Sequence, residues 1–239
     1  MIYEIADLKI KIDDPDVYTE KSLSGFISCS ETFDFDVSVS ENQINEERNS
    51  QPDVHLKNMR EYLKSVAFFR ALCRKLPFFG RFLLHCSVVE LGGECYAFLG
   101  RSGAGKTTHS LLWLKYLPEA KILSGDKPIV KSENGQFTVY GTPWRGKEKF
   151  GYNGKADLKG VCFIEQAAEN SITKLTPSEA GERLFSQVYF PNDPVAAAKT
   201  LEFVNELAGK IPAYLLKCDI SKQAFLLSYS ALAGKGEKV

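Results

Sequence analysis

Apolar and polar residues alternate in the first part of the chain. The stretches 2–5, 8–12 and 33–39 mix the two types in alternation, which is the pattern of half-buried strands. We expect these stretches to form antiparallel strands. The stretch 40–53, SENQINEERNSQPD, is polar throughout and predicts a loop or linker.

The hydrophobic period then changes to that of a helix. Apolar side chains between residues 55 and 76 recur three or four positions apart, at Leu56, Met59, Leu63, Val66, Ala67 and Leu72. This spacing predicts one amphipathic helix. We therefore divide the chain into a β-rich N-terminal segment (1–53), a connecting amphipathic helix (54–80) and a larger domain (81–239).

Short apolar runs separated by turn residues follow in the larger domain. Residues 82–91 and 94–100 are two apolar strands joined by Gly92-Gly93, and Asn134-Gly135 marks a second hairpin; both are pairs that tight hairpin turns favour. We expect further strands at 121–125, 127–132, 136–141, 160–166 and 213–220. The last of these closes the predicted fold.

Helix signals lie between these strands. A helix is expected over 108–117, and the run from Thr176 to Glu179 has the form of a capping box with proline at the first helical position. Asp193-Pro194 begins another helix that runs through Leu207 and ends at Gly209 and Pro212. Strands, hairpins and helices mixed in this order predict an α/β domain with a mixed β-sheet.

Charge and cysteine usage narrow the function classes. The 30 basic residues balance 30 acidic ones, giving a formal net charge of zero. Proteins that bind nucleic acids through phosphate neutralisation usually carry a basic excess, so we expect no nucleic-acid partner. The six cysteines form no CxxC pair, and several lie in apolar runs. This pattern predicts reduced, buried thiols in a cytoplasmic protein rather than disulfides or a zinc site.

Membrane insertion and export are not expected. No apolar stretch approaches the roughly 18 residues that a membrane-spanning helix needs. The first residues, MIYEIADLKIKIDD, have neither the basic region nor the continuous apolar run of a signal peptide.

The strongest chemical signal is the segment 100–107, GRSGAGKT, which matches the phosphate-binding pattern GxxxxGK[ST]. It lies between an expected strand and an expected helix, so its backbone N–H groups and the helix N-terminus can surround phosphates. In this pattern Lys106 reaches the β- and γ-phosphates and Thr107 offers its hydroxyl to Mg²⁺. The predicted nucleotide contacts are Gly100, Ser102, Gly103, Ala104, Gly105, Lys106, Thr107 and Thr108.

A phosphate loop also needs a carboxylate near the metal ion, usually at the end of another core strand. Asp126 follows the apolar strand 121–125 and is the candidate. The alternative is an ordinary turn aspartate, which is common in Gly-Asp pairs. The predicted ligand is therefore ATP, with Mg²⁺ held by Thr107 and Asp126.

With these motifs placed, residues 80–220 resemble the HPr kinase/phosphorylase-like branch of the phosphoenolpyruvate carboxykinase-like fold. The resemblance rests on a histidine-bearing strand before the phosphate loop, a Gly-Asp pair about twenty residues after it, and a GTPWxGKE segment. These are Leu84-His85-Cys86, Ser124-Gly125-Asp126-Lys127 and residues 140–148. It implies a P-loop domain of the mixed-sheet, phosphoenolpyruvate carboxykinase C-terminal type.

The resemblance implies that Asp126 is the general base and the carboxylate near the metal, with His85 as its partner. The family's second aspartate is replaced here by Lys127, so either Asp126 serves both roles or Glu148 assists. His85 could instead be a packed core residue, and Arg145 and Lys147 could either clamp phosphates or lie in solvent. We find no counterpart of the family's phosphorylase loop. The family's hexamers suggest a homo-oligomer.

Three functions remain open. The first is an ATP-dependent phosphotransferase that moves the γ-phosphoryl to a hydroxyl, on a serine of a protein or peptide. The second is a non-catalytic ATP/ADP-binding regulatory module, which the replacement by Lys127 favours. The third, a phosphoenolpyruvate carboxykinase, fits poorly because 239 residues are less than half the length expected of that enzyme.

Overall fold

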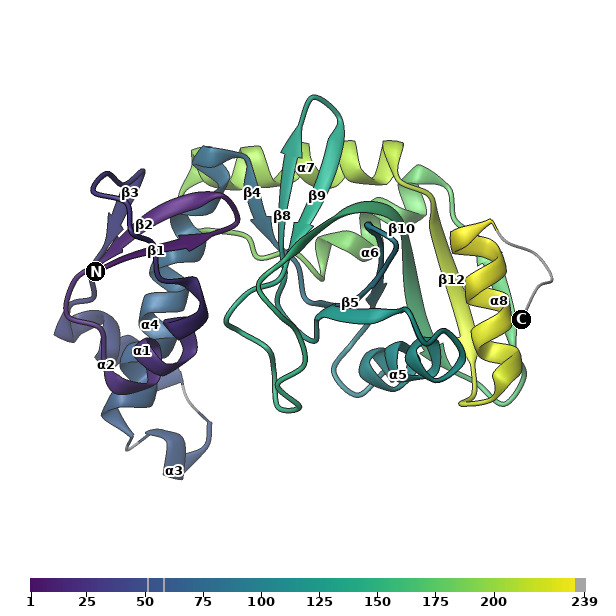
Figure 1. Cartoon of the computed structure of the whole chain (residues 1–239), viewed down its shortest axis with the longest axis horizontal. Coiled ribbons are helices and arrows are strands. Elements are labelled where there is room, and N and C mark those ends of the chain that lie inside the picture. Colours follow the sequence, from purple (N-terminus) through teal and green to yellow (C-terminus); the bar gives the residue numbers. More distant parts are fainter. Residues whose placement is uncertain (51, 58, 235–239) are drawn as a thin grey trace.

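The computed structural model describes residues 1–50, 52–57 and 59–234. These residues form a large mixed sheet with helices on both faces and a small three-stranded sheet near the N-terminus (Figure 1). The expected α/β class with a mixed sheet is thus confirmed, and the N-terminal part does contain a small three-stranded sheet, although helices make up more of it than strands do. Residues 51, 58 and 235–239, which belong to the three predicted segments, lie outside the described residues.

Strand β10 (Lys155–Gln166) is the centre of the large sheet. It pairs in parallel with β6 (Glu94–Leu99) and β12 (Ala213–Cys218), and antiparallel near its start with β9 (Gln136–Tyr140). The remaining strands are β4 (Arg81–Leu83), β5 (Cys86–Leu91), β7 (Lys121–Ser124), β8 (Ile129–Glu133) and β11 (Ser171–Lys174). Because β6, β10 and β12 run in one direction, their carboxyl ends meet at one edge, where open α/β sheets bind ligands.

The two faces of this sheet are covered by different helices: α5 (Lys106–Tyr116), α6 (Pro177–Phe185), α7 (Pro194–Lys210) and α8 (Lys222–Ala233). Successive residues of a strand point to opposite faces. Val161 and Phe163 accordingly join a core with α6 and α7, whereas Cys162 and Ile164 join a core with α5 and α8. Helix α5 is fixed to the sheet by the Ser87–Ser110 hydroxyl pair, 2.7 Å apart.

The N-terminal part packs against the β4–β8–β9 side of the large sheet (Figure 1). Its strands and helices are β1 (Ile2–Ile5), β2 (Leu8–Ile12), β3 (Phe35–Val37), α1 (Val17–Leu23), α2 (Glu41–Ser50), α3 (Val54–Lys57) and α4 (Arg60–Lys75). Two short 3-10 helices follow α1 and α4, at Ser24–Phe26 and Leu76–Phe79. One apolar core includes Ile10 and Leu72 from this part and Leu83 and Ile129 from the large sheet. Of the helices in the described ranges, none has both the length and the apolar composition required to cross a bilayer.

Many local predictions are confirmed. Both hairpin turns have positive φ at their central residues, at Gly92-Gly93 and Asn134-Gly135. Thr176 forms the expected capping box, and Asp193 caps α7. All six cysteines are free, and five of them are buried; Cys29 is exposed.

The expectation of purely antiparallel N-terminal strands is wrong for the third strand. β3 is shorter than the stretch 33–39 and pairs in parallel with β2. The cause is helix α1, which the alternating pattern did not indicate. Asp16 caps this helix by accepting hydrogen bonds from the backbone N–H groups of Tyr18 and Thr19, and a crossover through a helix leaves the two strands parallel.

The predicted loop 40–53 is wrong as well, because most of it forms α2. Ser40 and Gln43 form a reciprocal pair: the Ser40 N–H donates to Gln43 Oε1 at 2.8 Å and the Gln43 N–H donates to Ser40 Oγ at 3.4 Å. This is a capping-box geometry. Ile44 and Glu47 are buried on the packed side of the helix. Because only this narrow side contacts the rest of the protein, a mostly polar sequence can form the helix.

Two predicted elements are each interrupted. The helix expected over 54–80 is divided at Met59, whose φ and ψ of −90° and 86° are not helical. The strand expected over 82–91 stops after Leu83 and resumes at Cys86. The N–H groups of Leu84 and His85 donate instead to Pro128 O and Gln187 O, so the chain passes there from one strand neighbour to another.

The C-terminal part of the described chain contains more helix than the sequence predicted. Helix α7 continues through Gly209 to Lys210 instead of ending at the glycine. The strand 213–220 does not close the fold, because Ser221 caps the further helix α8. The division into segments 1–53, 54–80 and 81–239 stays a prediction.

Candidate functional site

The glycine-rich loop, residues 100–107, joins the carboxyl end of β6 to the start of α5. Gly100, Gly103 and Gly105 have φ values of 149°, 79° and 99°, a region that favours glycine. A Cβ on Gly100 would lie 3.0 Å from Ile164 O, whereas Gly103 and Gly105 face open space. The first glycine thus permits close packing on β10, and the other two shape an open turn.

The N-terminus of α5 is available to an anion. Its N-cap residue, Gly105, has no side chain, and no side-chain hydrogen bond caps the helix. The first N–H groups of a helix have no partner within the helix, and the helix dipole adds partial positive charge there. A phosphate group fits this combination of donors and charge.

Lys106 is held inside the loop. Its Nζ donates to Gly100 O at 2.8 Å and to Arg101 O at 3.2 Å. Burial lowers the pKa of this ammonium, although the nearby Cys86 and Asp126 act in the opposite direction. An anion in the loop would give Lys106 Nζ a charged acceptor in place of these neutral carbonyl oxygens. Hydrogen bonds between charged groups are stronger than those to neutral acceptors.

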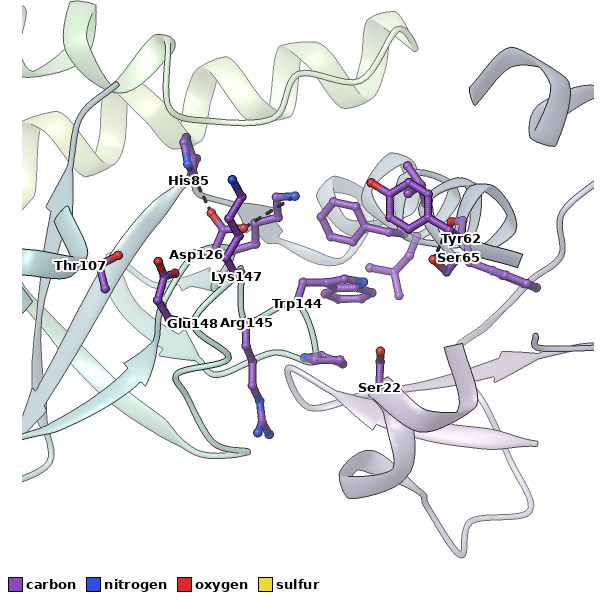
Figure 2. Close-up of a pocket in the computed structure, with 18 of the residues that line it drawn as sticks. Ser22, Tyr62, Ser65, His85, Thr107, Asp126, Trp144, Arg145, Lys147 and Glu148 are labelled. Atoms are coloured by element: carbon purple, nitrogen blue, oxygen red, sulfur yellow. Dashed lines mark hydrogen bonds and ion pairs between the residues drawn. The ribbon is translucent and has the colours of Figure 1, made fainter. Parts of the chain in front are cut away.

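Asp126 and His85 come together beside this loop. His85 Nε2 lies 3.3 Å from Asp126 Oδ1 (Figure 2). The backbone fixes the pair, because the N–H of Cys86, next to His85, donates to Asp126 O at 3.0 Å. The break between β4 and β5 therefore gives the histidine its position.

The carboxylate of Asp126 is stabilised in its charged form. Burial raises its pKa, but the His85 hydrogen bond and the positive charges of Lys127, His85 and Lys106 prevail, and its pKa is lowered. Lys127 Nζ lies 3.8 Å from Asp126 Oδ2 and 5.0 Å from the centre of the Phe69 ring. Lys127 thus joins Asp126 to helix α4.

The GTPW loop, residues 141–151, supports Asp126 from the other side. Gly146 has φ 73°, and a Cβ there would lie 3.0 Å from Asp126 Cβ. Thr142 Oγ1 donates to Lys127 O at 2.7 Å, and the Gly125 N–H donates to Phe150 O at 3.2 Å. Glycine is therefore required where the loop and the Gly125-Asp126 turn approach each other.

These groups share one cleft of about 860 Å³ (Figure 2). Of the predicted site residues, the cleft is lined by His85, Ser102, Gly103, Gly105, Lys106, Thr107, Thr108 and Asp126. Gly100 and Ala104 do not line it but face a neighbouring cavity with Arg183 and Gln187. Arg145, Lys147 and Glu148 also line the cleft.

The cleft has a second wall that the sequence did not indicate. This N-terminal wall is formed by residues of β2, α1, β3 and α4: Ile12, Thr19, Ser22, Leu23, Val37, Tyr62, Ser65, Val66, Phe68, Phe69 and Leu72. The apolar stripe of α4 was legible, but a stripe alone is typical of core packing. The available signal was the hydroxyl residues Tyr62 and Ser65 beside that stripe.

Another histidine near the loop, His109, is buried and packs its ring 4.9 Å from Phe98. Burial lowers its pKa to about 4, and Nε2 pairs with Ser228 Oγ at 2.8 Å. His109 therefore lies in the packed core between α5 and α8 and not in the cleft.

The donor set suits a metal ion bound together with phosphate. Across residues 1–50, 52–57 and 59–234, no group of three or more His, Cys, Asp or Glu side chains is arranged to hold a metal. Mg²⁺ in nucleotide sites keeps several waters and takes only one or two protein ligands besides phosphate oxygens. Thr107 and Asp126, which line the same cleft, meet this smaller requirement.

Comparisons with known proteins give little further information. No known family model matches the sequence, and no curated protein matches it. Among solved structures, the chain is similar to that of the Hpr(Ser) kinase/phosphatase from Coxiella burnetii, with 11% identity and a TM-score of 0.37 over 64% of this chain and 94% of that one. At this level the likeness is a distant one in chain path and assigns no activity.

Proposed function

We propose that this protein transfers the γ-phosphoryl group of ATP to a hydroxyl, on a serine of a protein or peptide. The observation that carries the proposal is a single cleft lined by Lys106 and Thr107 and by the contacting pair Asp126–His85. A phosphate cradle and an ionised carboxylate in one cavity are the parts that phosphoryl transfer needs.

Each residue has a defined task in this reaction. The glycine-rich loop and Lys106 hold the β- and γ-phosphates, and Mg²⁺, held by Thr107 and Asp126, would neutralise phosphate charge. The acceptor oxygen forms a bond to the γ-phosphorus as the bond from that phosphorus to the bridging oxygen breaks, and ADP leaves. Asp126 accepts the hydroxyl proton, while His85 orients the carboxylate through the 3.3 Å contact.

A transfer assay with γ-labelled ATP and serine peptides tests the proposal. Asp126→Asn removes the proton acceptor with little change in shape, so kcat should fall at least about 100-fold, in the range of general-base catalysis. Asp157→Asn is the matched control, since that carboxylate is exposed on β10 and outside the cleft. Label that reaches no hydroxyl acceptor, or equal rates in the two variants, would contradict the proposal.

A second candidate, a nucleotide-binding module without transfer, is favoured by one observation. Lys127 stands 3.8 Å from Asp126 and supplies a fixed positive charge close to the metal-proximal carboxylate. Such a charge competes with a cation for that carboxylate. The same variant separates the two functions, because a binding module would change its ATP affinity only modestly in Asp126→Asn and would show no transfer to lose.

A further inference from the structure

The N-terminal wall carries no charge. Of its eleven residues, seven are apolar and four bear hydroxyls, namely Thr19, Ser22, Tyr62 and Ser65. The charged side chains that line the cleft all come from the opposite side, as does His85: Lys106, Asp126, Lys127, Arg145, Lys147 and Glu148. The cleft therefore has a phosphate-binding end and an uncharged end, which Figure 2 shows on opposite sides of Trp144.

The two ends are connected through direct contacts. Lys127 Nζ lies 3.8 Å from Asp126 and 5.0 Å from the ring centre of Phe69, and the Phe69 ring is 4.4 Å from that of Trp144. The uncharged surface thus begins one side chain away from the proposed proton acceptor. A molecule whose hydroxyl lies at Asp126 can reach this surface.

Part of this surface remains uncovered. Val66, Phe69 and Trp144 are only half-buried, although they lie next to fully buried core residues such as Leu23 and Leu72. Apolar side chains that line a cavity and keep solvent contact gain free energy when a ligand covers them. Because these three side chains line the cleft, an apolar group of a molecule bound there would bury them.

The nucleoside has another space available. A separate cavity of about 520 Å³ lies next to Ala104 and Thr108 and is lined by Leu112, Gln166 and Ile220 among others. It adjoins the carboxyl ends of β10 and β12, where α/β sheets hold nucleotides. A nucleoside there would leave the N-terminal wall free for the acceptor.

We infer that the N-terminal wall binds a peptide acceptor, and that it selects a bulky apolar side chain next to the phosphorylated serine. This inference rests on the proposed transfer to a serine of a protein or peptide, and it adds where that acceptor binds and which flanking side chain it carries. An uncharged wall gives no partner to the carboxylates or phosphates of small charged metabolites. Apolar contacts with Val66, Phe69 and Trp144 suit a leucine or phenylalanine side chain instead.

The first experiment compares transfer to short serine-centred peptides whose residues flanking the serine are leucine or phenylalanine, alanine, aspartate or lysine. Apolar flanks should raise kcat/KM roughly tenfold or more over alanine, the effect of burying one such side chain. Val66→Asp should abolish this preference. Val17→Asp is the matched control, because Val17 is 65% exposed on α1 and does not line the cleft, and it should keep the preference.

The second experiment measures peptide binding without transfer. The chain has two tryptophans; Trp113 is fully buried, and Trp144 lines the cleft. Adding apolar-flanked peptide to the ADP-loaded protein should therefore change the fluorescence of Trp144, and the change should be absent in Trp144→Phe and weak in Val66→Asp. This readout tests the wall even if the protein transfers no phosphate.

The outcomes separate the two proposals. If the protein binds peptide, loses this binding in Val66→Asp and transfers phosphate to no peptide, the proposed function would be overturned but the peptide site at the wall would be supported. Transfer without a preference for apolar flanks, or a preference that survives Val66→Asp, would overturn the inference alone. Transfer to free serine as efficient as to the best peptide would contradict the peptide acceptor in both proposals. If the protein neither transfers phosphate nor binds peptide, both the proposed function and the peptide site at the wall would be overturned.

Discussion

At the scale of single residues, the ionisation of Asp126 decides what the cleft can do. Burial opposes the charge of this carboxylate, yet the His85 hydrogen bond and the neighbouring Lys127 and Lys106 lower its pKa below the ordinary value of 3.8. The group is therefore ionised at neutral pH and available to accept a proton or bind a cation. The sequence predicted Asp126 from its place directly after an apolar strand, whereas His85 was expected as its partner only from the family resemblance. It did not predict the contact of Lys127 with Phe69, which joins residues far apart in the chain.

The lowered pKa predicts a pH-dependent contribution to stability. The charged form of Asp126 is favoured in the folded state, so its contribution is complete above the unfolded pKa near 3.8 and is lost as the pH falls through the lower folded pKa. Compared by urea unfolding, the native protein should exceed Asp126→Asn in unfolding free energy near neutral pH. The difference should shrink below about pH 4, where the unfolded carboxyl becomes neutral. A difference that stays constant or grows in acid would contradict the assigned ion pairs.

Among the helices and strands, sequence signals between neighbouring residues predicted those turns and helix caps whose structure depends on one short segment alone. The hairpins at Gly92-Gly93 and Asn134-Gly135 and the cap at Thr176 required only neighbouring residues. Helices α1 and α2 were missed because their sequences are mostly polar and only a few positions are buried. Their caps, at Asp16 and Ser40, are visible in the sequence in hindsight. The break at His85 depends on the carbonyls of Pro128 and Gln187, which no local pattern reveals.

The GTPW loop provides a prediction at the scale of helices, strands and loops. Gly146→Ala and Gly93→Ala both put a side chain at positive φ, 73° and 85°, which costs about 1–2 kcal/mol of stability in either case. Only the Cβ at position 146 also meets Asp126, at 3.0 Å, whereas nothing lies within 4 Å at position 93. Thermal unfolding should show a loss for both variants, the larger one for Gly146→Ala because of this contact, and the transfer assay should show lowered kcat only for Gly146→Ala. Equal activity in both variants would show that the loop does not position Asp126.

At the scale of the whole molecule, the cleft belongs to both parts of the chain. The glycine-rich loop consists of eight contiguous residues (100–107), so its place between a strand and a helix was predictable, whereas its binding of phosphate stays a prediction. The N-terminal wall is assembled from β2, α1, β3 and α4, with Ile12 and Leu72 at its limits in the sequence. The shared core that includes Ile10, Leu72 and Ile129 holds this wall against the large sheet. Such a surface depends on how the parts pack, and the hydroxyl residues Tyr62 and Ser65 beside the apolar stripe of α4 were too weak a signal to indicate it.

Binding of a triphosphate by the glycine-rich loop is the step on which the proposed transfer depends, and titration calorimetry with ATP measures it. The native protein should bind ATP with Mg²⁺ present. Lys106→Ala should weaken binding roughly 10- to 100-fold, the effect of losing a charged hydrogen bond to phosphate, whereas Lys121→Ala, at an exposed position on β7 outside the cleft, should bind as the native protein does. No detectable heat with ATP or ADP, or equal affinity in the native protein and Lys106→Ala, would contradict triphosphate binding by the loop.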